Sequence, residues 1–208
     1  MGRKGQQVWA SSEVNGRDEA RTRQLIAEIK AGDKQAFTEL VRRYRSQVAA
    51  LAYRTVGDYD EAADITQLVF MKVNRNIWRY DSNKKFYTWL YRITVNACID
   101  HLRKHRRHQH EPLDNFRDLL ESSGLDPQDD YMRGRINEHI REASNRLNEK
   151  QRSAFVLRDV EGNKLGHVAD IMEMPEATVR WYLHRARTKV RKELLRRCPQ
   201  LLIALGIK

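Results

Sequence analysis

The sequence predicts an all-α protein, made of two helical domains that a flexible acidic linker joins. Apolar residues recur every three to four positions over long stretches, which is the period of an amphipathic helix. Alternating strand patterns are absent, and the 208 residues include only ten glycines and four prolines. This length is sufficient for two small domains. We expect a mobile N-terminal segment, a first domain, the linker, a second domain and a C-terminal tail, over 1–18, 19–107, 108–130, 131–196 and 197–208.

The first domain is predicted to contain four helices. Gly32 can end the first, Asp33 can cap the second, and Gly57 followed by Asp58 breaks the second. A turn-prone loop over 80–83 precedes the fourth helix. The four helices span about 19–31, 34–56, 60–77 and 84–105. The apolar face of the fourth comprises Phe86, Trp89, Leu90, Ile93 and Ala97.

Residues 111–130 differ in composition from the segments on either side. They hold seven Asp and Glu and a single Arg, together with Pro112 and Pro127. Such a segment is predicted to be extended and to be repelled by nucleic acid. Whether it is more than a passive tether is open.

The net charge of +11 and the isoelectric point of about 9.8 suit a polyanionic partner. No apolar run approaches the roughly 20 residues that span a bilayer, and the N-terminus lacks a signal-peptide core. We therefore expect no membrane insertion. Cys98 and Cys198 are too few for a disulfide framework, which indicates a reduced protein in the cytoplasm.

Residues 165–194 are typical of two helices joined by a tight turn, with Pro175 opening the second helix. In the second helix, one face packs inward through Val179, Leu183, Ala186 and Val190. Between 178 and 197 the chain carries eight Lys and Arg against one acid, Glu193. A helix with an apolar back and a basic, aromatic front fits the DNA major groove. The alternative is an amphipathic helix whose basic face is merely solvated.

A histidine-rich run offers a different chemistry. It comprises His101, His105, His108, His110 and Glu111. His101 and His105 share one helix face at a spacing that can bind zinc. The competing interpretation, a basic helix end whose imidazoles lie beside phosphates, is favoured, so we expect no metal and no other cofactor. No phosphate-binding loop or other common catalytic motif is present, and we expect no enzymatic activity.

Three segments resemble bacterial sigma factors of the extracytoplasmic-function (ECF) group: 36–73, 86–107 and 147–194. In the first, the similarity to the family pattern AEDxxQEVF is carried by Ala62, Asp64, Ile65, Gln67, Val69 and Phe70. In the second, the matching residues are Trp89, Leu90, Arg92, Ile93, Asn96, Asp100 and Arg103. The third resembles the helix-turn-helix domain called sigma-4. The first resembles the opening of the domain called sigma-2, and the second resembles the promoter-melting segment.

The resemblance implies a protein that binds core RNA polymerase and directs promoter-specific initiation, without a small-molecule substrate. The β′ clamp helices would contact Asp60, Glu61, Asp64, Gln67 and Phe70, while the β flap would contact sigma-4. Asp60 and Glu61 would also complement the helix dipole at a helix start. An anti-sigma factor that covers both domains is implied as a further partner.

Promoter DNA is expected to contact both domains. Unpaired bases of the −10 element would be captured by stacking on Tyr80, which we interpret as a surface residue rather than a core residue, and by polar groups. The −10 set is Tyr80, Asp81, Ser82, Asn83, Lys84, Lys85, Arg92, Asn96, Arg103, Lys104, Arg106 and Arg107. The −35 set is Glu176, Thr178, Arg180, Trp181, His184, Arg185 and Lys189.

The chain departs from the family pattern at several positions. Glu173 stands where a glycine is usual in the helix-turn-helix corner, so we expect a strained or remodelled turn. His167 replaces a Glu, and Trp181 with Tyr182 replaces a frequent Ser-Arg, which puts the −35 preference in question. Ala63 and Leu68 replace two acids, and so predict a more apolar polymerase contact.

Two other functions fit parts of the sequence. One is a stand-alone helix-turn-helix regulator that binds duplex DNA as a dimer, although the motifs at 60–70 and 80–96 serve no purpose in duplex binding. The other is a metal-dependent nucleic-acid enzyme that uses the histidines. Run-off transcription with core polymerase, metal analysis and a nuclease assay distinguish these functions.

Overall fold

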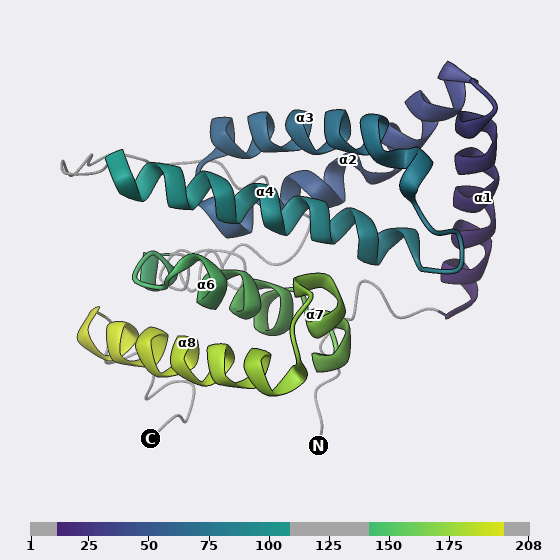
Figure 1. Ribbon diagram of the computed structural model, residues 1–208. Coiled ribbons are helices and arrows are strands. Elements are labelled where there is room, and N and C mark those ends of the chain that lie inside the picture. Colours follow the sequence, from purple (N-terminus) through teal and green to yellow (C-terminus); the bar gives the residue numbers. More distant parts are fainter. Residues whose placement is uncertain (1–11, 109–141, 198–208) are drawn as a thin grey trace, which may run out of the picture.

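The computed structural model describes residues 12–108 and 142–197, with side chains described over 19–105 and 142–196. Within these ranges the chain is helical and contains no strand, which confirms the all-α prediction (Figure 1). Most of the acidic linker and the C-terminal tail lie outside the described residues. The elements are α1 (Ser12–Lys30), α2 (Lys34–Val56), α3 (Tyr59–Asn76), the 3-10 turn η1 (Ile77–Arg79), α4 (Phe86–His108), α6 (Glu149–Phe155), the π turn η2 (Val156–Val160), α7 (Leu165–Met172) and α8 (Glu176–Arg197).

Short-range signals set several helix ends. The Asp33 carboxylate accepts from the amides of Gln35 and Ala36 at the start of α2, and Gly57 ends this helix at φ 89°. Asp58 caps α3. By contrast, α1 begins at Ser12, inside the segment that was expected to be mobile. Packing of its second half supplies a helical nucleus, and extending it requires only one hydrogen bond per residue.

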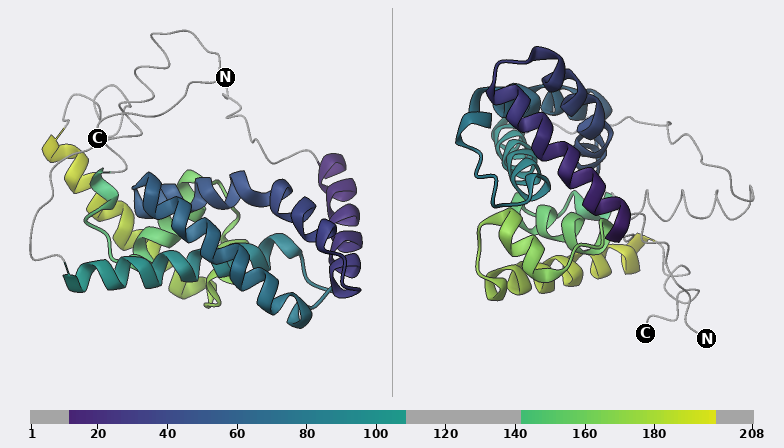
Figure 2. Two further views of the ribbon diagram at one scale, coloured as in Figure 1. Left: turned by 90° about the horizontal axis from the view of Figure 1, so that it is seen from above. Right: turned by 90° about the vertical axis from the view of Figure 1, so that its right-hand side faces the viewer.

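The N-terminal domain is a bundle in which α2, α3 and α4 lie side by side and α1 runs across one end (Figures 1 and 2). Each of the four helices contributes one side to the core of this domain. The fully buried core residues include Leu25, Leu40, Val69 and Leu90. The predicted apolar face of α4 is confirmed: three of its residues are buried in this core and the other two, Trp89 and Ile93, pack against it.

The C-terminal domain comprises α6, η2, α7 and α8. Asn148 and Gln151 form a capping box at the start of α6. The inward face predicted for the last helix is also confirmed, since Val179, Leu183, Ala186 and Val190 are buried. Glu173, in the turn between α7 and α8, adopts a left-handed conformation at φ 52°, ψ 47°, as the departure from glycine predicted.

The two domains pack against each other, and α4 lies between them (Figures 1 and 2). One side of α4 faces the N-terminal core. The other side presents Tyr91, Val95 and Ile99, which share a second core with residues of η2, α7 and α8 such as Leu157 and Ile171. The outer helices α3 and α8 are therefore on opposite sides of the molecule. No helix in the described part of the chain is long and apolar enough to cross a membrane.

Candidate functional site

The outer face of α3 exposes both polar and apolar groups. Asp60, Asp64 and Gln67 are exposed, as the sequence predicted. Leu68 and Met71 are also exposed, to 43% and 46%, and follow Asp64 and Gln67 at helical spacing. Met71 was absent from the predicted set, although its position one turn after Gln67 was a usable signal. This face can therefore form charged contacts and bury apolar area at once.

Two residues predicted on that face point elsewhere. Phe70 is 7% exposed and packs in the N-terminal core, because the helical period places it beside Val69 and Val73 on the inward side. Its ring therefore belongs to the core here, and its role in polymerase binding stays a prediction. Glu61 is half-buried and turns toward the end of α4, where it contacts His101 and His105.

Tyr80 is a core residue, and its prediction as a stacking surface was wrong in this structure. The ring is 4% exposed and lies 5.5 Å from Phe86 and 5.3 Å from Trp89, centroid to centroid. Its hydroxyl donates to the carbonyl of Lys84, so the polar end is satisfied inside the protein. Burial raises the pKa of Tyr80 to about 12.

The loop that follows Tyr80 is exposed throughout. The Asp81 carboxylate accepts from the amide of Asn83 and so stabilises a turn before α4, which begins at Phe86 rather than at Lys84. The polar side chains of Asp81, Ser82 and Asn83 thus project from a loop, as predicted, and those of Lys84 and Lys85 project from the same loop rather than from the helix in which they were expected. Trp78, in η1, is 60% exposed and is an aromatic surface that the sequence reasoning did not identify.

The predicted −10 residues of α4 fall into two groups. Asn96, Arg103 and Lys104 are exposed. Arg92 is instead paired with the C-terminal domain: Nη1 lies 2.6 Å from Glu173 Oε1, and Nη2 donates to the Asp170 carbonyl at 3.0 Å. The side chains of Arg106 and Arg107 lie outside the described part of the structure.

A pocket of about 410 Å³ opens between α4, α6 and the end of α7. Asn96 and Arg103 line it from α4, and Lys150 lines it from α6. Its apolar walls include Ile99 and Met172. Two predicted nucleic-acid contacts therefore open onto the groove between the domains.

Further polar contacts hold α4 against α7 and its neighbours. Thr88 Oγ1 lies 3.0 Å from His167 Nε2, and the Tyr87 hydroxyl donates to Asn163 Oδ1 at 3.4 Å. Burial lowers the pKa of His167, which favours its neutral form in this contact. The face of α4 that carries Arg92 is consequently covered in part by α7.

Contacts also join α2 to the C-terminal domain. Arg54 is paired with Glu161 of the loop before α7, and buried Arg152 of α6 donates to the carbonyl of Val56 at 3.1 Å. Both contacts involve the last turn of α2, which contributes the cation Arg54 to the first and the carbonyl of Val56 to the second. The domain contact is thus polar at this edge, whereas along α4 it combines an apolar core with polar contacts.

The front of α8 presents a basic and aromatic surface. The guanidinium of Arg185 lies over the ring of Trp181, 4.6 Å from its centroid, and that ring is 50% exposed. Arg180 lies 3.0 Å from Glu176 in the first turn, and His184 is exposed between them and the later basic residues. These predicted −35 residues are therefore brought together on one outward face.

Three other residues of α8 are less available for contact with DNA. Thr178 is half-buried, and Lys189 donates to the side chain of Gln151 at 3.1 Å. Arg187 was not among the predicted contacts, and it pairs with Asp159 of η2 at 2.6 Å. The later part of α8 is thus tied to its own domain.

Comparison with known proteins matches both domains. The model of Sigma-70 region 2 matches residues 40–108, and that of Sigma-70 region 4 matches residues 138–190. The ECF RNA polymerase sigma factor SigW of Bacillus subtilis is 32% identical over 177 residues, which cover 81% of this chain and 94% of that protein. The RNA polymerase sigma-H factor of Pseudomonas aeruginosa is 32% identical over 178 residues, with 82% and 92% covered.

Solved structures show the same fold. CnrH in complex with the cytosolic domain of CnrY superposes with a TM-score of 0.57 at 22% identity, over 84% of this chain and 97% of that chain. The sigma factor RpoE in complex with the anti-sigma factor NepR from Bartonella quintana gives a TM-score of 0.58 at 22% identity, over 76% and 96%. The chain belongs to the ECF RNA polymerase sigma factors, which bind RNA polymerase and direct promoter-specific transcription initiation.

Proposed function

We propose that this sigma factor divides its task among three surfaces: α3 binds the polymerase, α8 reads −35 duplex, and the loop 81–85 with α4 binds melted −10 DNA. The observation that carries the proposal is the arrangement of α3 and α8. The two helices lie on opposite sides of the molecule (Figure 1) and each carries exposed side chains, so one chain can hold polymerase and duplex DNA at the same time.

On α3, Asp60, Asp64 and Gln67 would meet basic side chains of the β′ clamp helices. Leu68 and Met71 lie beside them and would bury apolar area against the aliphatic parts of the same partner. Charged groups then direct the encounter, while the apolar pair supplies affinity.

On α8, the stack of Arg185 on Trp181 holds the guanidinium before DNA arrives. A pre-oriented guanidinium loses little freedom when it forms paired hydrogen bonds with a guanine edge in the major groove. To contact DNA, Arg180 must break its ion pair with Glu176. Because this pair is exposed, breaking it costs at most about 1 kcal/mol. The β flap would contact the same domain, on surfaces away from the DNA.

Capture of −10 DNA requires a change in the domain contact. Arg92 is occupied by Glu173, and α7 covers part of the same side of α4. We therefore place the packed arrangement before polymerase binding, with α7 leaving α4 as the two domains take up their sites. The exposed polar loop 81–85 is available in either state.

Other parts of the proposal follow from the family. Polymerase supplies the chemistry, so the chain itself acts as an initiation factor in the cytoplasm and not as an enzyme. An anti-sigma factor would be a natural regulator, as in the complex of the similar sigma factor with NepR. It would have to cover the outer face of α3 or keep α7 on α4.

Run-off transcription with purified core polymerase tests the proposal. The metal-free chain should confer a defined start site on core enzyme that is inactive on the same template alone. A chain that binds duplex DNA yet never confers a start site would instead be a stand-alone regulator.

A further inference from the structure

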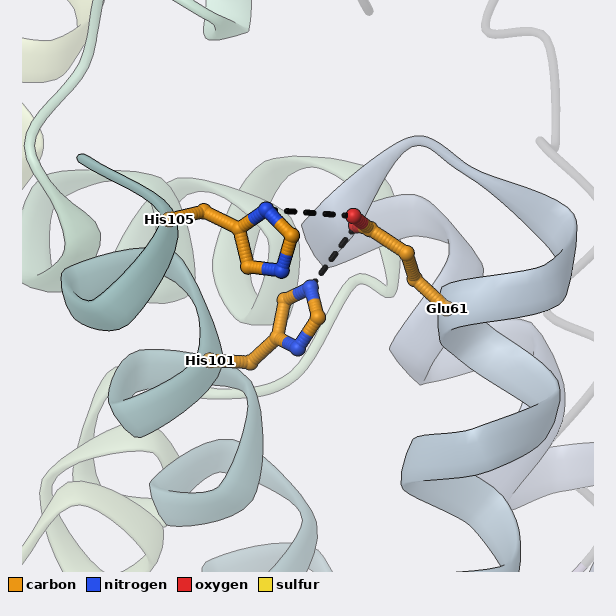
Figure 3. Close-up of side chains that lie close together, drawn as sticks. All are labelled: Glu61, His101 and His105. Carbon is orange, nitrogen blue, oxygen red and sulfur yellow. Dashed lines mark ion pairs between the residues drawn. The ribbon is translucent and has the colours of Figure 1, made fainter. Parts of the chain in front are cut away.

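Two imidazoles and one carboxylate converge where α3 begins and α4 nears its end (Figure 3). His101 Nε2 lies 2.8 Å from Glu61 Oε2, and His105 Nδ1 lies 3.5 Å from Glu61 Oε1. The two rings lie next to each other, with centroids 4.2 Å apart and planes tilted by 30°. One donor atom from each residue fits within 4.8 Å of the other two.

We propose that Glu61, His101 and His105 form a site for a divalent transition-metal ion, with Zn²⁺ as the first choice. Histidines four residues apart on a helix are common zinc ligands, and a carboxylate is a common third ligand. Two ligand atoms at tetrahedral angles around zinc are about 3.3 Å apart. The separations of 2.8 Å from His101 Nε2 to Glu61 Oε2 and 3.5 Å from His105 Nδ1 to Glu61 Oε1 lie on either side of that value, so each imidazole has a carboxylate oxygen at a distance close to it.

The environment of His101 supports a ligand rather than a simple ion pair. Its Nε2 atom is buried and makes no hydrogen bond, although Glu61 Oε2 is only 2.8 Å away. The contact therefore lacks the alignment of a hydrogen bond, and an unsatisfied buried polar atom is costly. A metal ion bonded to both atoms, off the line that joins them, would satisfy both.

The site is enclosed on one side and open on the other. The side chains of Glu61 and His101 are 30% and 20% exposed, whereas that of His105 is 46% exposed. Three protein ligands leave a coordination position, which water could fill from the open side near His105. An ion bound here would join the first turn of α3 to the last turns of α4 and so stabilise the N-terminal bundle.

The test uses the full chain, freed of metal with a chelator and titrated with Zn²⁺ by calorimetry, or with Co²⁺ by visible absorption. We expect one ion per chain and a thermal unfolding midpoint that rises with metal concentration. His101→Asn, His105→Asn and Glu61→Gln should each weaken binding at least tenfold and abolish the rise in the midpoint. Circular dichroism should show unchanged helicity in each variant.

His184→Asn is the matched control, because this imidazole is exposed on α8, away from the cluster. It should bind metal as the wild type does. The proposal is overturned if no stoichiometric binding occurs, or if the three cluster variants bind Zn²⁺ as tightly as the wild type. Neither result depends on transcription, so a failure here is distinct from a failure of the proposed function.

Discussion

Arg92 on α4 lies 2.6 Å from Glu173 in the turn of the helix-turn-helix, and the contact joins the two domains. Each residue belongs to a segment that we assign to promoter DNA. Their side chains are 27% and 59% exposed, so the ion pair alone contributes at most about 1 kcal/mol and is screened by salt. The apolar contacts of α4 hold the domains together. The ion pair adds little stability, but it keeps the Arg92 guanidinium bound to Glu173.

Replacing Glu173 separates two effects. Glu173→Ala should remove the ion pair but keep the left-handed strain, whereas Glu173→Gly should remove both. We expect the glycine variant to be more stable than the alanine variant by roughly 1 kcal/mol in chemical denaturation, because only glycine adopts this φ without strain. Equal stability of the two variants would show that the turn is unstrained. Both variants should remove the ion pair of Arg92 and leave its hydrogen bond to the Asp170 carbonyl.

The domain contact should depend on pH through His167. Burial lowers its pKa in the packed state below the ordinary value of 6.5. The separated state then binds more protons, so packing is favoured above pH 6.5 and is lost as the pH falls through the lowered pKa. Fluorescence energy transfer between labels on α3 and α8 should decrease from about pH 8 to about pH 5.5. His167→Gln should flatten the curve, and an unchanged curve would exclude His167 as the cause.

Asp64→Ala should weaken association with core polymerase by at least about fivefold, or about 1 kcal/mol, because it removes an exposed carboxylate from the centre of the α3 face. Glu19→Ala removes a carboxylate from α1 and serves as the control. Binding of −35 duplex should not change. A parallel loss of duplex binding would place Asp64 in a structural role.

Arg185→Ala should weaken binding to the cognate −35 duplex by roughly 1–3 kcal/mol and relax the sequence preference. Trp181→Ala should produce part of the same loss, because the guanidinium loses the ring on which it is stacked. Binding is measured by fluorescence anisotropy on matched and mismatched duplexes over a range of salt. An unchanged preference with a smaller salt slope would assign Arg185 to a phosphate.

Tyr80→Phe should destabilise the N-terminal domain by about 1 kcal/mol, because the carbonyl of Lys84 loses its hydroxyl donor. The ring stays in place among Phe86 and Trp89, so binding of single-stranded −10 DNA should be nearly unchanged. Trp78→Ala should weaken that binding if the exposed indole is the stacking surface. The reverse pattern would restore Tyr80 as the base contact.

Local signals in the sequence were sufficient for much of the fold. Asp33 as a cap, Gly57 as a stop, the side of α4 that faces the N-terminal core and the inward side of α8 were all predicted, since each depends on neighbours within one or two helical turns. The strained turn at Glu173 was predicted from the family resemblance instead, because a glycine is usual at this position.

Tertiary structure decided what each face of a helix meets. Periodicity showed that α4 has an apolar side, but not that Tyr91 and Val95 on its other side pack on α7. Tyr80 looked like a surface ring because its burial depends on Phe86 and Trp89 after a loop. Glu61 meets His101 only because α3 and α4 pack side by side. Such contacts join residues distant in sequence, and no local period records them.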